Sequence, residues 1–257
     1  MESIVNSEKL HGLKVFSKIE EMAEAFFLLF EQELSCAQSE NRACNIALSG
    51  GNTPLLIFEF LARKQRTWIN LHFLHIYWSD ERCVAPDSKD SNYGNIWKSI
   101  IRYIDIPEEN IHRIRGEDDP LLESKRYSDT LRNHIPIENG FPRFDLMLLG
   151  IGEDGHTASI FPNAMEMLNS DNSCYVAIHP QTKQNRITLS LRLINNSKKI
   201  LFMVTGKSKS DVIHAIAKNK KEVVNYPAAY VKPKNGELFW YLDSEASRKL
   251  RKRFIFF

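Results

Sequence analysis

A chain of 257 residues, 43% of them hydrophobic, is long enough to bury a substantial core and suits a single α/β domain over residues 1–257. Its 34 Lys and Arg residues nearly balance its 32 Asp and Glu residues, so a net charge of +2 excludes the global field typical of proteins that bind nucleic acid. The four cysteines form no C-x-x-C pair, which argues against a disulfide framework or a zinc ribbon and favours reduced thiols in a cytoplasmic protein.

The ends of the chain give no pattern of a membrane protein. The N-terminal "MESIVNSEKLHGLKVF" has acidic residues where a signal peptide needs cations, and no run approaches the roughly 18 apolar residues of a membrane span. The C-terminal "RKLRKRFIFF" is expected to end an amphipathic helix that packs on the fold, with anchoring to a surface as the alternative. We therefore expect no membrane partner.

Apolar and polar positions predict alternating helices and strands along the chain. Residues 18–35 carry apolar positions at helical spacing with acids on the other face, which predicts an amphipathic helix. An apolar strand then ends at Leu48, and a Gly-Gly break leads to a helix from Pro54, because proline suits the first helical position. Further strands are predicted at residues 71–78, 144–150, 174–179, 186–191, 198–204 and 237–242, with a helix at 208–219. Residues 105–120, rich in charge and broken by Pro and Gly, are expected to leave the sheet.

This alternation indicates an α/β fold with a Rossmann-like, doubly wound, mostly parallel sheet that has helices on both faces. Ligands of such sheets bind at the carboxyl ends of the strands. Four polar loops are therefore expected at one edge of the sheet; they follow Leu48, Trp78, Leu149 and Val204.

Residues 150–155 in "LMLLGIGEDGHTAS" spell G-x-G-x-x-G, a pattern found in dinucleotide-binding loops. The next strand lacks the terminal acid that would hold a ribose, and Glu153 and Asp154 would oppose a pyrophosphate. The glycines instead favour a sharp turn that presents His156, since an imidazole is the most serviceable general base at neutral pH. Asp154 either orients this imidazole or caps a helix after the turn.

No metal or cofactor is expected from the sequence. His72 and His75 lie three residues apart in a predicted strand, which places them on opposite faces, so they are interpreted as structural. No histidine and carboxylate spacing elsewhere demands a metal ion.

The loop "SGGNTP" is the better candidate for binding an anion. Gly50 and Gly51 allow successive backbone N–H groups to point at one centre, and the helix after the loop directs its positive end there. Asn52 and Thr53 add side-chain donors. Because no G-K-[ST] follows, a sugar phosphate is a more natural ligand than a nucleotide. A turn without a ligand remains the alternative.

Charged residues at the other strand ends complete the candidate phosphate site. Asp80 and Arg82 lie in "WSDERCV", Arg186 opens "RITLSL", and Lys209 lies in "TGKSKSD". An arginine grips a phosphate bidentately, whereas a lysine acts as a point charge. In the alternative, Ser49 of "ALSGG" is the nucleophile of a hydrolase triad.

The chain resembles the 6-phosphogluconolactonases of the glucosamine-6-phosphate isomerase/6-phosphogluconolactonase superfamily. The resemblance rests on motifs that occur in family order, namely "ALSGGNTP", "WSDERCV" with "SNYGN", "FDLMLLGIGEDGHTASIFP", "RITLSL", "TGKSK" and "YPAAYVKP". It implies hydrolysis of 6-phospho-D-glucono-1,5-lactone to 6-phospho-D-gluconate in the oxidative pentose phosphate pathway, by a monomer or weak oligomer. His156 would activate water, and a backbone N–H of the glycine turn or an arginine would stabilise the oxyanion.

Two other functions stay open at this point. The glucosamine-6-phosphate deaminases of the same superfamily share the D-G-H turn, but they have a glutamate five residues after the histidine, where this chain has Phe161. A non-catalytic sugar-phosphate-binding protein could use the same fold, although it would have no need of His156 on a glycine turn.

Overall fold

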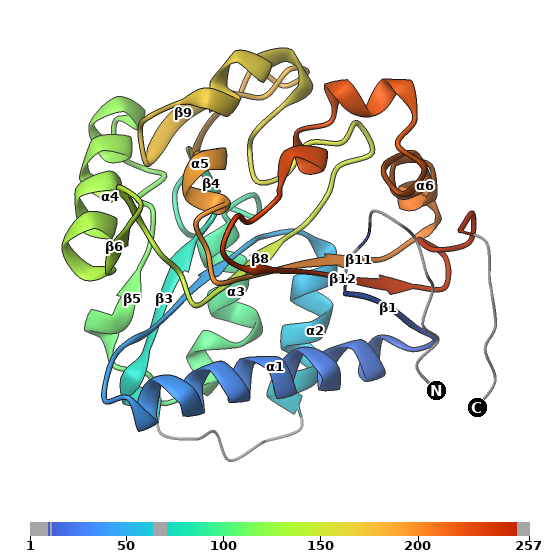
Figure 1. Ribbon diagram of the computed structural model, residues 1–257. Helices are drawn as coiled ribbons and strands as arrows, with labels where there is room; N and C mark the ends of the chain where they lie inside the picture. Colours follow the sequence, from blue (N-terminus) through green and yellow to red (C-terminus); the bar gives the residue numbers. More distant parts are fainter. Residues whose placement is uncertain (1–9, 11, 64–70, 251–257) are drawn as a thin grey trace.

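Seven strands form one parallel sheet in the order β1-β12-β11-β8-β2-β3-β5 (Figure 1). The computed structural model describes residues 10, 12–63 and 71–250. The strands of this sheet are β1 (Leu13–Phe16), β2 (Cys44–Leu48), β3 (Leu74–Trp78), β5 (Ile111–His112), β8 (Leu146–Leu149), β11 (Lys199–Val204) and β12 (Glu237–Asp243). The predicted α/β class and the parallel sheet are confirmed.

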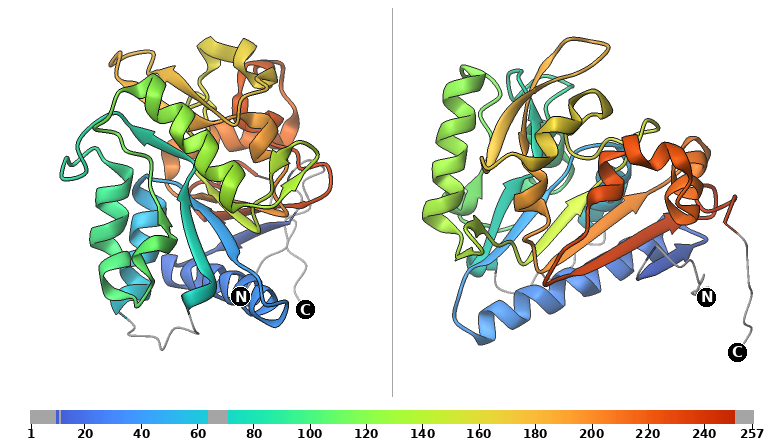
Figure 2. Two further views of the ribbon diagram at one scale, coloured as in Figure 1. Left: turned by 90° about the vertical axis from the view of Figure 1, so that its left-hand side faces the viewer. Right: turned by 45° about the horizontal axis from the view of Figure 1, so that its top comes forward.

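Helices lie on both faces of the sheet, as expected for a doubly wound fold (Figures 1 and 2). One face carries α1 (Ile19–Ser39), α2 (Asn52–Arg63) and α3 (Asn92–Ser99), and the other carries α4 (Pro120–His134), α5 (Leu191–Ile194) and α6 (Ser210–Lys218). Apolar residues three and four apart give α1 a buried stripe, and its Phe26 packs edge-on against Phe58 of α2 with ring centroids 6.1 Å apart.

The strand order reverses between β2 and β8. From β2 the chain adds β3 and β5 on one side, and from β8 it adds β11 and β12 on the other. β2 and β8 are themselves hydrogen-bonded neighbours, with Ile46 opposite Leu146. The two loops that leave their carboxyl ends therefore diverge, and such a switch point opens a crevice in α/β sheets.

A small antiparallel sheet lies apart from the main one and has the order β4-β10-β9. Its strands are β4 (Asp80–Arg82), β10 (Asn185–Leu189) and β9 (Cys174–Ile178), and a separate hairpin pairs β6 (Ile137–Glu138) with β7 (Phe141–Pro142). The predicted strands at 174–179 and 186–191 are confirmed, but the tertiary structure decides that β10 pairs antiparallel with both β9 and β4. Ser79 joins the two sheets, since its N–H donates to Leu48 O and its carbonyl accepts from Leu189 N.

Several local predictions differ from the structure. Residues 105–120 do not simply leave the sheet, because Ile111–His112 pairs with β3 as an edge strand. The helix α4 has no predicted counterpart; it buries only three residues spaced by four, and Asp119 caps its start by accepting from two backbone N–H groups. The helix α2 begins at Asn52 instead of Pro54.

The remaining differences concern the histidines and the chain ends. His72 lies in a 3-10 turn before β3, so the prediction that His72 and His75 lie in one strand is wrong. His75 forms a hydrogen bond with another histidine, since its Nδ1 lies 3.0 Å from Nε2 of His112. Residues 244–249 form turns, and the rest of the predicted C-terminal helix, like residues 1–9, lies outside the described residues. Within the described ranges, no helix has the length and apolar character needed to cross a membrane.

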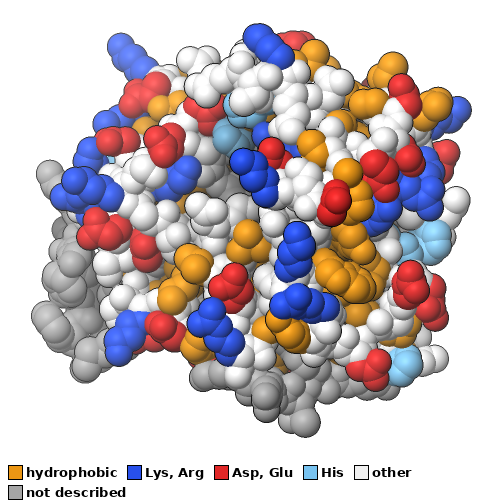
Figure 3. Space-filling view, turned by 180° about the vertical axis from the view of Figure 1, so that it is seen from behind, with side chains coloured by type: hydrophobic (Ala, Val, Ile, Leu, Met, Phe, Trp, Pro, Cys, Tyr) orange, Lys and Arg blue, Asp and Glu red, His pale blue; other side chains and the backbone are white. Residues whose placement is uncertain are grey.

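The surface carries charges of both signs. On the face shown in Figure 3, Lys and Arg side chains are interspersed with Asp and Glu side chains. Ion pairs occur between surface charges of the protein, such as Arg113–Glu117, with Nη2 and Oε1 2.6 Å apart. This mixture agrees with the small net charge and gives that face no extended field of one sign.

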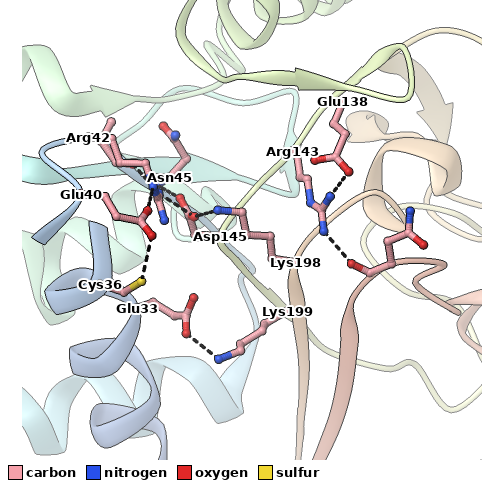
Figure 4. Close-up of polar contacts among 12 residues, drawn as sticks. Glu33, Cys36, Glu40, Arg42, Asn45, Glu138, Arg143, Asp145, Lys198 and Lys199 are labelled. Atoms are coloured by element: carbon pink, nitrogen blue, oxygen red, sulfur yellow. Dashed lines mark hydrogen bonds and ion pairs between the residues drawn. The ribbon is translucent and has the colours of Figure 1, made fainter. Parts of the chain in front are cut away.

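A buried carboxylate joins the amino ends of three strands, opposite the crevice (Figure 4). Asp145, directly before β8, is 2% exposed. Its Oδ1 accepts hydrogen bonds from Arg42 Nη1 and Lys198 Nζ, both at 2.8 Å. Its Oδ2 accepts from the N–H of Asn45 on β2, also at 2.8 Å. Because these partners come from distant segments, the carboxylate holds the amino ends of β2, β8 and β11 together.

Replacing Asp145 by alanine should lower the free energy of unfolding by about 3 kcal/mol, because it leaves two cations and a buried backbone N–H without their partner. Urea denaturation measures this loss. The control is Glu59→Ala, which removes an exposed ion pair with Arg63 and should cost about 0.5 kcal/mol or less. Equal stability of the two variants would contradict the structural role of Asp145.

Candidate active site

Four polar loops meet at the carboxyl edge of the sheet, as the sequence predicts. The strands that precede them, β11, β8, β2 and β3, are consecutive neighbours. Two of the loops flank the switch point: the anion loop (residues 49–54) follows β2, and the histidine turn (residues 150–156) follows β8. The candidate site is therefore centred on this switch point.

The histidine turn is held by its own backbone. Gly155 has a φ of +84°, and its N–H donates to Gly152 O at 3.1 Å. The N–H of Gly152 in turn donates to His156 O at 2.9 Å. A bridge between Thr157 and Ile160 comes next instead of an α-helix, so Asp154 has no helix to cap here.

Asp154 lies against the imidazole of His156. Its Oδ1 is 2.6 Å from Nδ1 of His156 and also accepts the backbone N–H of that residue at 3.1 Å. Burial alone would raise the pKa of Asp154. The hydrogen bond from His156 and the electrostatic attraction of its imidazole outweigh burial and hold this pKa below its ordinary value. A carboxylate at Nδ1 keeps a proton there and leaves Nε2 free to accept one. The His156 side chain is 32% exposed, so water can reach it.

Residues from the C-terminal part of the chain cover the outer side of this turn. A Cβ at position 155 would lie 2.4 Å from the ring of Tyr226, so only glycine fits there. The N–H of Ala228 donates to Gly155 O at 3.0 Å. The motif "YPAAYVKP" therefore packs directly on the histidine turn.

The anion loop has the backbone conformation that its glycines predict. Gly51 has a φ of +102°, and α2 begins at the next residue, so the first N–H groups of this helix face the crevice edge. Thr53 Oγ1 lies 2.7 Å from Thr205 Oγ1, which links this loop to the one after β11. Ser49 is only 5% exposed, which disfavours its alternative role as an exposed nucleophile.

Asp80 connects the anion loop with the segment after the histidine turn. It is 4% exposed, and its Oδ2 accepts from Ser159 Oγ at 2.7 Å. Asn92 Nδ2 donates to the backbone carbonyl of Asp80 at 2.9 Å. The same Asn92 packs so closely on Gly50 that a Cβ there would lie 1.9 Å from Oδ1. The carboxylate of Asp80 is buried and already accepts a hydrogen bond from Ser159. Asp80 therefore suits a role in linking these loops more than a role in binding a phosphate, which its negative charge would repel.

Arg82 and Arg186 are directly opposite one another on β4 and β10. Like charges in this position repel, and the Nε atoms of both are buried without a hydrogen-bond partner among the described residues. Burial and the neighbouring charge of Arg82 lower the pKa of Arg186. An anion bound between the two guanidinium groups would relieve the repulsion.

Comparison with known proteins decides the family. The model of the family described as glucosamine-6-phosphate isomerases/6-phosphogluconolactonase matches residues 17–240. The chain belongs to this family. A 6-phosphogluconolactonase of Haemophilus influenzae is 44% identical to it over 223 residues, which cover 85% of this chain and 93% of the relative.

Two solved structures extend the likeness to the fold. The devB protein has 37% sequence identity and a TM-score of 0.86, with 93% of this chain and 99% of that chain covered. The 6-phosphogluconolactonase from Thermotoga maritima has 28% identity and a TM-score of 0.77, with 90% and 99% covered. The family fold therefore extends over nearly the whole described chain.

Two further residues of the expected site lie at the starts of helices. Asn52 is exposed at the start of α2, and Lys209 is half-buried at the start of α6, where no described residue forms a hydrogen bond or ion pair with its side chain. The sequence predicted no role for Asn92 or Ser159, which both contact Asp80, although Asn92 lies in "SNYGN" and Ser159 in "GEDGHTASIFP". Neither did it assign His179, whose only signal was its place at the end of a predicted strand.

Proposed function

We propose that the protein hydrolyses 6-phospho-D-glucono-1,5-lactone to 6-phospho-D-gluconate, the lactonase step of the oxidative pentose phosphate pathway. The observation that carries this proposal is His156, held by Asp154 at the switch point, with the Arg82 and Arg186 pair on a small sheet that bonds to Ser159, three residues further along the chain. The relative from Haemophilus influenzae bears the name of this activity. A base beside a cationic pair suits a substrate that combines a hydrolysable group with a phosphate.

In the proposed reaction, the phosphate is held by Asn52, Thr53, Arg82, Arg186 and Lys209, which fixes the lactone ring over the histidine turn. Nε2 of His156 takes a proton from water as the water oxygen attacks the C1 carbonyl. The tetrahedral intermediate collapses with cleavage of the bond from C1 to the ring oxygen, and the imidazolium returns its proton to that oxygen. The N–H groups of Gly152 and Gly155 already donate within the turn, so other donors of the crevice would stabilise the oxyanion.

Phe161 favours the lactonase over the deaminase. Phe161 stands where the deaminases have a glutamate. Its ring is buried, and the centroid of this ring is 5.1 Å from that of the His156 ring. Lactone hydrolysis needs a base that activates water, whereas deamination would lack that carboxylate.

Paired assays test the proposed function. The lactone is generated in situ from glucose 6-phosphate and acid release is followed with and without the protein, while ammonia release from glucosamine 6-phosphate is measured separately. Faster acid release without ammonia supports the lactonase. Ammonia without lactone hydrolysis would mean a deaminase, and binding of sugar phosphates without either reaction would mean a non-catalytic binding protein.

Lys209→Ala should raise KM for the lactone roughly tenfold with little change in kcat, because its ammonium is expected to hold the phosphate equally in the ground and transition states. Steady-state kinetics give both constants. Lys207→Ala is the matched control, since Lys207 is an exposed lysine in the same turn. The same KM for Lys209→Ala and for the control would remove Lys209 from the phosphate site.

A further inference from the structure

The small antiparallel sheet presents one face to the histidine turn and to the segment directly after that turn. Residues directly opposite in an antiparallel pair point to the same face, and so do residues two apart on one strand. Arg186 is opposite Arg82 on β4 and opposite Ala177 on β9. Two residues after Arg186, Thr188 accepts the N–H of Ser159 through Oγ1 at 3.2 Å. The face that carries both arginines is therefore the one that packs toward the crevice.

His179 extends this face by one step beyond Ala177. Its N–H donates to Gln184 O at 2.9 Å, which continues the pairing of β9 with β10. Its ring packs edge-on against Phe161, with centroids 5.2 Å apart, and the centroid of the same Phe161 ring is 5.1 Å from that of His156. His179 therefore shares a strand face with the arginine pair and a ring neighbour with the proposed base His156.

The proton of the His179 imidazole has a fixed position. The N–H groups of Gln181 and Thr182 donate to Nδ1 at 3.3 and 3.2 Å, so Nδ1 carries no proton and the neutral ring has its proton on Nε2. Burial and the charge of Arg186 lower the pKa of His179, which keeps the ring neutral at pH 7. Nothing in the described part of the chain accepts from Nε2–H, which leaves a neutral donor beside the arginines.

We propose that His179 is a further substrate-binding residue, whose Nε2–H donates a hydrogen bond to an anionic oxygen of the ligand held between Arg82 and Arg186. This inference rests on the anion site of the proposed function. Each of the three terminal oxygens of a phosphate monoester can accept more than one hydrogen bond, so His179 can add a donor to the residues proposed to hold the phosphate. Because this donor is neutral, it adds no further positive charge to repel the two guanidinium groups.

Two substitutions separate this role from the structural role of the same ring in the hairpin. His179→Asn keeps an oxygen that can accept the turn N–H groups, as asparagine does in Asx turns, but it removes the donor at the Nε2 position. His179→Gln reaches the Nε2 position with an N–H but removes the acceptor at Nδ1. Only the first should therefore weaken anion binding, and only the second should loosen the hairpin.

Calorimetric titration with inorganic phosphate and with 6-phosphogluconate measures binding, and thermal melting measures stability. H179N should bind both anions roughly tenfold more weakly, whereas H179Q should keep most of the affinity. Both variants lose the ring contact with Phe161, so H179Q, which also lacks the Nδ1 acceptor, should melt roughly 2–4 °C lower than H179N. In lactone hydrolysis, H179N should raise KM with little change in kcat.

Arg186→Met reports on the anion site itself and should also lose affinity for both anions. Weaker binding in R186M with wild-type affinity in H179N would overturn the role of His179 but leave the site in place. Equal losses of affinity in H179N and H179Q would trace the effect to the hairpin and would also overturn it. Wild-type affinity in R186M would overturn the anion site of the proposed function.

Discussion

Replacing His156 by alanine is expected to lower kcat for lactone hydrolysis by about 10²–10⁴-fold, the usual contribution of a positioned general base. In the proposed function other residues hold the substrate phosphate, so KM and the affinity for 6-phosphogluconate should stay close to those of the wild type. Steady-state kinetics and calorimetric titration give the two quantities. Because the side chain is partly exposed and the turn is held by backbone hydrogen bonds, the variant should fold.

The control for His156→Ala is His134→Ala, which removes an exposed histidine at the end of α4. It should leave kcat unchanged. Asp154→Asn should lower kcat in the same direction as His156→Ala, because a neutral amide no longer stabilises an imidazolium at Nδ1. A near wild-type rate in His156→Ala would show that another group activates water.

Gly152→Ala is expected to lower kcat by about 10²-fold or more without unfolding the protein. A Cβ at this position would lie 2.1 Å from Nδ1 of His156 and 2.4 Å from Oδ1 of Asp154. Both atoms are ends of side chains, which can move away at little cost to the fold. Their movement, however, breaks the 2.6 Å contact on which the orientation of the imidazole depends.

Gly150→Ala in the same turn is the matched control. A Cβ there meets nothing within 4 Å, and the residue is not in a left-handed conformation. This variant should keep the wild-type rate, and circular dichroism with thermal melting should show both variants folded. Equal activity of the two variants would mean that the contact between His156 and Asp154 is not needed for the reaction.

Local patterns in the sequence were enough to predict much of the fold. The strand of residues 44–48 is apolar except for Asn45, and the strand of 199–204 is apolar after Lys199. The helix of 19–39 has a clear apolar stripe, so short apolar runs and helical periodicity indicate these elements. The helix of 120–134 escaped prediction because most of its residues are polar and only one side touches the protein.

The histidine turn was also predictable from its residues. Glycines at fixed positions, a carboxylate and a histidine lie within seven consecutive residues, and their geometry depends on short-range backbone conformation. The structure adds that the Asp154 carboxylate contacts the imidazole and the backbone N–H of His156.

The sequence by itself determined most of the longer strands, the two glycine-containing loops and the candidate base, because turn chemistry and hydrophobic patterns act over a few residues. Only the tertiary structure decided that β2 and β8 are neighbours, that Arg82 is opposite Arg186, and that His179 shares their face. These relations depend on which strands pair and in what register. Pairing joins segments far apart in the chain, and no local pattern of residues specifies it.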